Sequence, residues 1–306
     1  MFILDESTVV TFDGKTYPKY GWAVVLAGGP GSGKGFSKGS ICIDAKSFDV
    51  DELKKQYQKA SARPDTSIYK NAPKHDWDMK NSDDVSTLHN IVATGNGKGL
   101  NYGYDKRSEY NFFNSNANNT DNLPNVIFDI TGDKPQKIIS KAATAKSLGY
   151  KLSFVWVVTN REEAMIRNAG RDRVVGDEIF HSKHNTINSV MLDFITKEAG
   201  KYFDEAWVLF ASNSHAGGTK AELDWLKAHR TIKFDKVNGN FVIKDKEARR
   251  IINTLGEAEP NPSNPEKYIK KDDVVNAISK YDKYSPVRSY DTKFKKERLI
   301  RNRRKK

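Results

Sequence analysis

Apolar residues gather in five short runs along the chain, and most of the segments between them carry apolar residues at helical spacing. The runs cover residues 22–27, 45–50, 125–129, 152–158 and 206–210. Runs this short are typical of buried strands, and helical segments between strands are typical of βαβ units. The pattern therefore predicts an α/β fold in three layers, with a mainly parallel five-stranded sheet between helices.

Further helices and two hairpins complete the predicted elements. We expect a helix that begins near Glu52 and helices over residues 35–41, 84–93, 135–148, 161–169, 186–202, 221–229 and 246–255. Asp13-Gly14 and Asn238-Gly239 are strong two-residue turn signals, so each predicts a β-hairpin. The first hairpin, residues 8–17, is expected to decorate the edge of the sheet.

A glycine-rich loop follows the first apolar run. It is made of Gly28, Gly29, Pro30, Gly31, Ser32 and Gly33, with Lys34, Gly35 and Phe36 directly after it. This is the pattern G-x-x-x-x-G-K between a strand and a helix, in which backbone N–H groups cradle phosphate oxygens. The helix N-terminus and Lys34 add positive charge. The loop therefore predicts ATP binding, and a glycine turn without a ligand is the alternative.

The position after the lysine departs from the Walker pattern. Gly35 stands where serine or threonine would help to hold Mg²⁺, and the first hydroxyl residue is Ser37. Asp129 ends the third apolar run, which is the Walker B arrangement, in which the carboxylate binds Mg²⁺ directly or through water. Asp129 and Ser37 are therefore the predicted metal ligands.

Asp51 lies at the end of the second apolar run and just before a predicted helix. Aspartate at this point can cap the helix, which requires no chemistry. In many P-loop kinases an acid here faces the hydroxyl of the acceptor. Both interpretations stand, and one residue can serve both.

Three arginines, Arg167, Arg171 and Arg173, follow the fourth apolar run closely. Arginines in this place can clamp a phosphoryl group during its transfer, because its charge lies on the equatorial oxygens. The alternative is a solvated basic end of a helix.

Four polar residues near the later runs are weaker candidates. His181 and His184 have no partnering cysteine or acidic triad, so we interpret them as surface groups or substrate contacts and not as a metal site. Ser212 and Asn213 follow the fifth run, and ligands bind at the carboxyl ends of strands in open α/β sheets. We expect these two residues to touch the nucleotide base.

Residues 61–124 are the least regular part of the chain and are rich in Asn, Asp, Lys, Ser and Gly. A long irregular stretch inside a domain is commonly functional or disordered, so this insert is the expected acceptor-binding segment. Its aromatic residues can stack on bases, or they can form a small core of the insert. They are Tyr102, Tyr104, Tyr110, Phe112 and Phe113.

Charge is distributed unevenly along the 306 residues. The formal net charge is +12, and residues 264–306 carry 15 Lys/Arg against 6 Asp/Glu. We expect a P-loop kinase domain over 1–255, a proline-containing linker over 256–266 and a basic tail over 267–306 that binds a polyanion such as nucleic acid.

The composition bears on the cellular compartment in which the protein is expected. The only cysteine is Cys42, which excludes internal disulfides and cysteine-based zinc sites and suits a reducing environment. No apolar run approaches the roughly 20 residues that span a bilayer, and the N-terminus lacks the pattern of a secretory signal. We therefore expect a cytoplasmic protein with no membrane contact.

The order of these features resembles the zeta-toxin-like branch of P-loop kinases, which overlaps in pattern with polynucleotide kinases. The resemblance covers Trp22 to Phe210 and is carried by GGPGSGKG, the two aspartates and the arginines. It implies that Lys34 binds the nucleotide phosphates and that Asp51 is the base toward the acceptor hydroxyl. It also implies that Arg167, with Arg171 or Arg173, stabilises the transferred phosphate.

The chain departs from the family pattern at Gly35, in its short helix after the loop, which contains Gly39, and in the insert. Its Asn/Lys/Tyr-rich composition looks like that of a phage product, which would act in the host cytoplasm. The predicted function is ATP- and Mg²⁺-dependent phosphotransfer to a hydroxyl of a nucleic acid, nucleotide or nucleotide-sugar. The alternative is a non-catalytic ATP-binding protein that docks on nucleic acid or an assembly through its tail.

Overall fold

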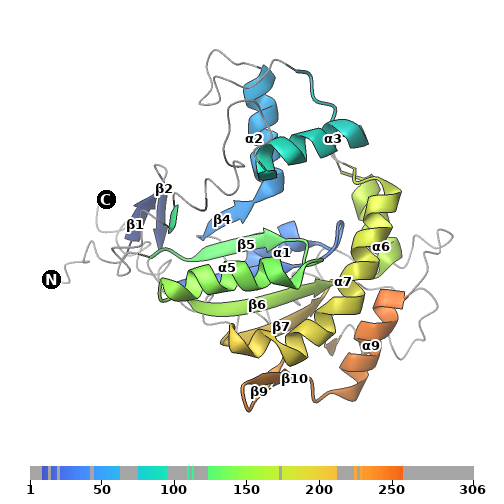
Figure 1. The fold of residues 1–306 in the computed structure, drawn as a ribbon. Coiled ribbons are helices and arrows are strands. Elements are labelled where there is room, and N and C mark those ends of the chain that lie inside the picture. Colours follow the sequence, from blue (N-terminus) through green and yellow to red (C-terminus); the bar gives the residue numbers. More distant parts are fainter. Residues whose placement is uncertain are drawn as a thin grey trace, which may run out of the picture.

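The computed structural model describes most of the chain before residue 258 and is drawn in Figure 1. The described residues are 9–12, 15–18, 21–41, 45–62, 75–94, 109, 112–113, 123–171, 174–211, 224–225, 228–229 and 231–257. The basic tail and most of the irregular insert lie outside them.

A six-stranded sheet forms the centre of the molecule, with the strand order β4-β5-β3-β6-β7-β8. Its strands are β3 (Trp22–Ala27), β4 (Lys46–Asp49), β5 (Val126–Ile130), β6 (Lys151–Val158), β7 (Glu205–Phe210) and β8 (Thr231–Lys233). The first five strands in this order pair in parallel, and β8 is antiparallel to β7. The predicted α/β class and the five parallel strands are confirmed. The sixth strand was not predicted, because three residues are too short to show an alternating pattern.

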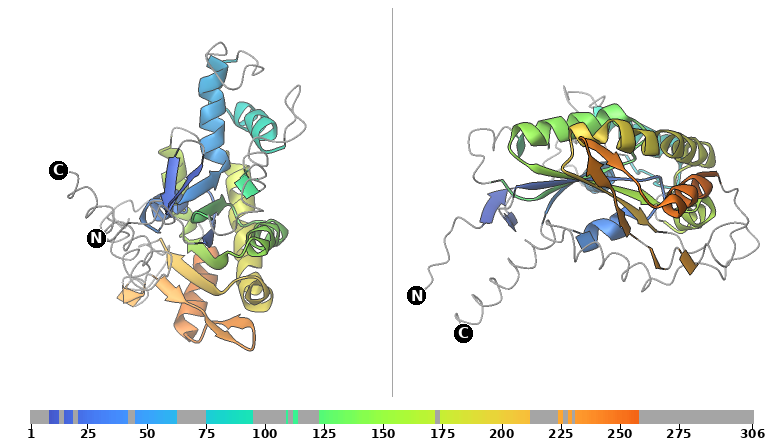
Figure 2. Two further views of the ribbon diagram at one scale, coloured as in Figure 1. Left: turned by 90° about the vertical axis from the view of Figure 1, so that its left-hand side faces the viewer. Right: turned by 90° about the horizontal axis from the view of Figure 1, so that it is seen from below.

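Helices cover both faces of this sheet, as Figure 2 shows. The helices of the described residues are α1 (Lys34–Ile41), α2 (Val50–Ala62), α3 (Ser82–His89), α5 (Pro135–Ser147), α6 (Arg161–Ala169), α7 (Asp177–Lys197) and α9 (Lys246–Glu257). Of these, α2 and α3 project away from the sheet (Figure 1). A π-helical turn, η3 (Asn90–Thr94), continues α3, and a 3₁₀ turn, η5 (Ala199–Lys201), follows α7. The helices α5 and α7 lie on one face and α1 lies on the other, which gives the expected three layers.

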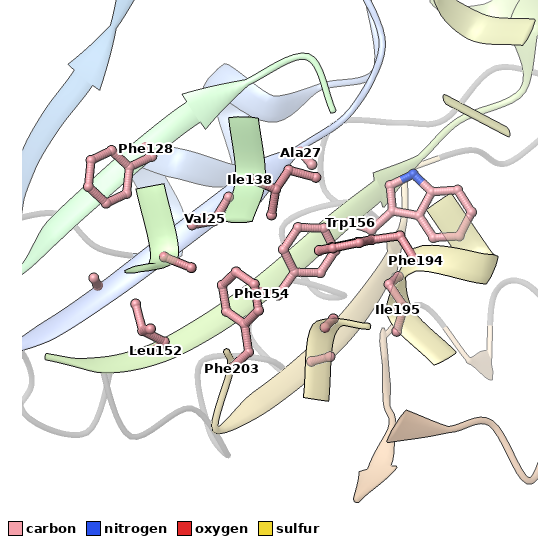
Figure 3. Packing of buried hydrophobic residues seen from close by; sticks show 14 of the residues in the cluster. Val25, Ala27, Phe128, Ile138, Leu152, Phe154, Trp156, Phe194, Ile195 and Phe203 are labelled. Carbon is pink, nitrogen blue, oxygen red and sulfur yellow. The ribbon is translucent and has the colours of Figure 1, made fainter. Parts of the chain in front are cut away.

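The main core lies between the sheet and the layer of α5 and α7 (Figure 3). Alternate residues of β3 and β6 point into it, among them Val25, Phe154 and Trp156, and they meet Ile138 of α5 and Phe194 of α7. The intervening residues of the same strands form a second cluster on the opposite face. Burial of both faces explains why these strands read as continuous apolar runs in the sequence.

The long helix α7 begins at Asp177, nine residues earlier than the sequence suggested. Phe180, His184 and Ile187 are buried and continue the same face as the later apolar residues of the helix. Two acids in the first turn also stabilise a helix N-terminus at this point. The predicted start of this helix at residue 186 is therefore wrong, and both histidines, His181 and His184, lie on α7.

Both predicted hairpins are present. The first pairs β1 (Val9–Phe12) with β2 (Lys15–Pro18), and these strands form a two-stranded sheet of their own apart from the central sheet. The second pairs β9 (Asp235–Val237) with β10 (Asn240–Val242). Asn238 and Gly239 between them have φ of 49° and 79°, as a tight hairpin turn requires.

Two further predictions concern a late helix and the absence of membrane-spanning segments. Most of the predicted helix over residues 221–229 lies outside the described residues. Within the part of the chain that the structure describes, no helix is both long and apolar enough to cross a membrane.

Candidate active site

The glycine-rich loop joins β3 to α1 at the carboxyl edge of the sheet. Gly31 and Gly33 have φ of 72° and 94°, a region that side chains other than glycine rarely adopt. A Cβ on Gly31 would lie 2.0 Å from the carbonyl oxygen of Ala164 in α6. The backbone N–H of Gly28 donates to the carbonyl of Thr131 at 3.1 Å, which ties the loop to the end of β5. The motif's glycines are therefore needed by the backbone path itself.

Within the described part of the chain, two polar side chains at the loop, Lys34 and Ser32, have no hydrogen-bond acceptor from outside the loop. The ammonium of Lys34 donates to the carbonyls of Gly28 at 2.6 Å and Gly29 at 3.1 Å. Burial lowers the pKa of Lys34, and the nearby Asp129 carboxylate opposes that shift. The hydroxyl of Ser32 is buried and has no hydrogen-bond partner among the described residues. A phosphate group in the loop would supply acceptors for both side chains.

Asp129 and Asp49 end neighbouring strands and are direct register partners in the pair β4 and β5. The Nζ of Lys38 on α1 lies 2.7 Å from Asp49 Oδ2 and 3.8 Å from Asp129 Oδ2. Burial is the main cause that raises the pKa of Asp129 to about 6; Lys34 and Lys38 oppose the shift, and the charge of Asp49 acts in the same direction as burial. The site therefore places two carboxylates beside two lysines.

Of the two predicted metal ligands, Asp129 lines a cavity and Ser37 is buried away from it. Asp129 lines the cavity described below, and its carboxylate is the hard oxygen ligand that Mg²⁺ prefers. Ser37 is fully buried, and its hydroxyl donates to the carbonyl of Gly33 at 3.1 Å. The described residues hold no group of three or more His, Cys, Asp or Glu that could bind a metal ion. Asp129 is thus the residue of this pair that fits an Mg²⁺ bound together with phosphates.

Asp51 stands in the first turn of α2 with its side chain about half exposed. Its backbone N–H donates to Asp49 Oδ1 at 2.9 Å, so Asp49, one residue before the helix, makes the capping contact. The predicted cap by Asp51 is therefore wrong. The Asp51 carboxylate lines the cavity and lies 3.2 Å from the ammonium of Lys54.

Arg167 projects from α6 toward the loop. Its Nη2 donates to the buried carboxylate of Glu163 at 3.0 Å and to the carbonyl of Ala211 at 2.8 Å. A Cβ on Gly33 would lie 3.6 Å from its Nη1. Arg171 lines the cavity. Arg173 lies outside the described residues, as do Ser212 and Asn213, and of Phe36 only the backbone within α1 is described.

One cavity of about 820 Å³ joins these groups. It runs from the loop, at Pro30 and Lys34, past the ends of β4 and β5 to a wall formed by α3 and α5. Its lining carries seven Lys and Arg side chains against five Asp and Glu side chains. The basic residues beyond Lys34 are Lys54, Lys134, Lys137, Lys141, Lys183 and Arg171. Lys141 pairs with Glu109, and Lys183 pairs with Asp133 at 2.5 Å. The cavity can therefore take an anionic molecule next to a nucleotide phosphate chain.

The structure gives new positions to residues of the insert. Phe112 and Phe113 are buried and pack with Phe48 and Phe128 in the main core. The prediction that Phe112 stacks on a base is therefore wrong, because its side chain is fully buried in the core. Phe113 lines the cavity. A separate small core joins α2 to α3 and η3. It contains Tyr57, Trp77, Leu88, Ile91 and Val92. Tyr102, Tyr104 and Tyr110 lie outside the described residues.

His184 was interpreted as a surface group or substrate contact, and this is wrong. Its side chain is 4% exposed and lies against the glycine-rich loop. The signal that could have placed it is its spacing from Phe180 and Ile187, which puts it on the buried face of α7.

No protein-family model and no curated protein matches the chain. Solved structures match it distantly. A crystal structure of AvrRxo1-ORF1:AvrRxo1-ORF2 with sulphate ions is 13% identical over 85% of this chain and 76% of that chain, with a TM-score of 0.49. The same complex with ATP gives 13% identity, the same coverage and a TM-score of 0.48. A structure from the PezAT toxin–antitoxin system of Streptococcus pneumoniae is 14% identical over 80% of this chain and 87% of that chain, with a TM-score of 0.42. We interpret the site from its own geometry.

Proposed function

We propose that this protein is an ATP-dependent phosphotransferase that moves the γ-phosphate to a hydroxyl acceptor. The observation that carries the proposal is that Lys34, Asp51, Asp129 and Arg171 line one cavity, although they come from four separate segments of the chain. In phosphotransfer an acid can orient the acceptor hydroxyl and an arginine can stabilise the transferred group. A loop that only bound a nucleotide would need neither of them beside it.

Each residue then has a definable role. Lys34 and the loop N–H groups hold the β- and γ-phosphates. Asp51 accepts the proton of the acceptor hydroxyl as the new bond between acceptor oxygen and phosphorus forms. The bond between the γ-phosphorus and the bridging oxygen breaks, and ADP leaves with that oxygen. Arg167 and Arg171 offset the charge on the equatorial oxygens in the transition state.

Asp129, which lines the cavity, would hold Mg²⁺ through its carboxylate. The ion would supply positive charge that offsets the charge developing on the leaving group. The remaining rate gain would come from positioning of acceptor and ATP in one cavity.

The acceptor is proposed to carry phosphate, as a nucleotide, a nucleotide-sugar or a nucleic acid does. The support is the basic wall along α5, where Lys134, Lys137 and Lys141 line the cavity. Lysine ammonium groups recognise phosphate as point charges.

A second candidate is a non-catalytic ATP-binding protein that docks through its basic tail. The observation that favours it is the missing hydroxyl at Gly35 together with the buried position of Ser37. Acceptor-dependent release of ADP separates the two candidates, because a binding module holds ATP without turnover.

The test is transfer of labelled γ-phosphate from ATP with Mg²⁺ to single-stranded DNA, duplex DNA, RNA, nucleotides and nucleotide-sugars in parallel. We expect label on one class of acceptor and a loss of at least about 100-fold for Asp51→Asn, since a general base contributes roughly that much. Glu52→Gln, an exposed neighbour on the same helix turn, is the matched control and should transfer label normally. ATP binding without transfer to any acceptor would sink the proposal in favour of the second candidate.

A further inference from the structure

Three consecutive residues of α7 contact three different segments around the cavity. Lys183 donates to Asp133 Oδ2 at 2.5 Å, in the segment between β5 and α5. His184 contacts the carbonyl of Pro30 in the glycine-rich loop at 2.8 Å. Asn185 accepts from the guanidinium of Arg161 at the start of α6. One turn of α7 therefore holds the loop, the β5 edge and α6 against one another.

The contact of His184 with the loop is a packing contact as well as a hydrogen bond. A Cβ on Gly29 would lie between 2.5 and 2.9 Å from three atoms of the imidazole ring. The ring of Phe180 lies 4.5 Å from it on the other side, one helix turn away. The imidazole is thus fixed between α7 and the glycine-rich loop, and only glycine at position 29 leaves room for it.

The hydrogen bond assigns the form of the ring. A carbonyl oxygen only accepts, so the Nε2 of His184 must carry the hydrogen and donate it to Pro30. Burial is the main cause that lowers the pKa of His184 to about 4; the hydrogen bond to Pro30 opposes the shift, and the charges of Lys34 and Arg161 act in the same direction as burial. The imidazole is therefore neutral at physiological pH, with its proton on Nε2.

This bond fixes the peptide between Pro30 and Gly31. In a trans peptide the C=O and the following N–H point in opposite directions. The carbonyl of Pro30 is directed at His184, so the N–H of Gly31 points away from α7. The N–H groups of such a loop bind phosphate only when they face it together.

From this we propose that His184 is a positioning residue of the ATP site, which orients the Pro30–Gly31 peptide by donating from Nε2. It acts through the loop and touches neither phosphate nor acceptor. The inference rests on the proposed function only for the statement that the loop binds ATP.

The experiment is titration calorimetry of the full chain with MgATP. His184→Leu keeps bulk and removes the donor, whereas the side-chain amide of His184→Gln can still donate to Pro30. We expect ATP affinity to fall about tenfold for the leucine variant, because the partly buried Pro30 carbonyl loses its donor, and about twofold or less for the glutamine variant. His229→Gln, an exposed histidine outside the cavity, should bind like the wild type.

A purely structural role has a different signature. Partial unfolding lowers the fitted number of sites and leaves the affinity of the folded fraction unchanged. In the transfer assay the leucine variant should raise the KM for ATP far more than it lowers kcat. Equal affinity in the wild type and the leucine variant would overturn the inference, and so would glutamine and leucine variants that are equally weak.

A second measurement does not depend on any variant folding. Nitrogen NMR of histidine-labelled wild type should show His184 as the Nε2–H tautomer, with a resonance that shifts when ATP saturates the loop. An Nδ1–H tautomer, or a resonance that ATP leaves unmoved, would overturn the inference. Failure of the wild type to bind ATP would instead overturn the proposed function.

Discussion

The glycine-rich loop and the lysines of α5 line different parts of the same cavity, yet they are built by different means. The loop is positioned by backbone: positive φ at two glycines, a carbonyl contact to β5 and close approach to α6. The wall is made of long side chains, such as Lys134 and Lys137, on one face of a regular helix. A backbone-built site tolerates almost no substitution, whereas a wall of side chains can change its ligand one residue at a time.

The largest effect on ATP affinity is therefore expected from adding a single methyl group to the loop. Gly31→Ala puts a Cβ at 2.0 Å from the Ala164 carbonyl on a residue with φ of 72°, and backbone on both sides cannot give way. We expect ATP affinity to fall by about 100-fold or more, as strain of a few kcal/mol implies. Calorimetric titration with ATP measures it.

The control for this change is Gly170→Ala at the end of α6. A Cβ there meets only ordinary contacts, the nearest at 3.6 Å, and φ is −80°. That variant should bind ATP like the wild type. Normal ATP affinity in Gly31→Ala would contradict the backbone argument.

A second prediction concerns pH and the contact between α7 and the loop. The folded protein lowers the pKa of His184 to about 4 from an ordinary 6.5, so the unfolded chain takes up the proton first. Stability contributed by the neutral imidazole is therefore lost as pH falls from about 6.5 toward about 4. Asp129, with its pKa raised to about 6, acts in the opposite direction over nearly the same range.

The comparison that isolates His184 is wild type against His184→Gln. Urea unfolding at pH 7 and pH 5 should show the wild type losing about 2 kcal/mol relative to the variant between these two values. A difference between the two proteins that does not change with pH would show that the buried imidazole does not titrate as described.

A third prediction tests the side-chain wall. Lys137→Gln removes one cation from the cavity and leaves the helix intact, so the KM for the acceptor should rise about fivefold, since a partly exposed ion contact is worth roughly 1 kcal/mol. ATP affinity should not change. Lys146→Gln, on the same helix but outside the cavity, is the matched control. Equal effects of both variants would mean that the wall does not bind the acceptor.

The same contrast explains what the sequence could predict. The strands of the central sheet are buried on both faces, so each gives a continuous apolar run, and the loop motif fixes its own conformation. These local signals placed Lys34 and Asp129 at one edge of the sheet. The wall of α5 gave no such signal, because lysines on an exposed helix face look the same whether or not a cavity lies beside them.

Two residues escaped prediction because their partners are remote or differently spaced. His184 is 154 residues from Pro30 along the chain, and only packing of α7 against the loop brings them together. Asp49 ends a strand, so it looked like part of the sheet, while Asp51 stood in the expected capping place. The cap shifted because α2 begins at Val50, directly after the strand.

The smallest effect is expected from changes to this cap, in which the side chain of Asp49 accepts from the backbone N–H of Asp51. Asp49→Asn keeps an oxygen that can accept from the N–H of Asp51 and loses the ion pair with Lys38, whereas Asp49→Ala loses both. Relative to the asparagine variant, the alanine variant should lose about 1 kcal/mol of unfolding free energy, the usual value of an N-cap. Urea unfolding measures the difference.

In the transfer assay the alanine variant should also be slower than the asparagine variant, because the first turn of α2 carries Asp51, the acid that we propose as the base toward the acceptor. Equal stability and equal rate in the two variants would mean that the capping bond does not hold Asp51 in place, and that the acid is positioned by its contact with Lys54 instead.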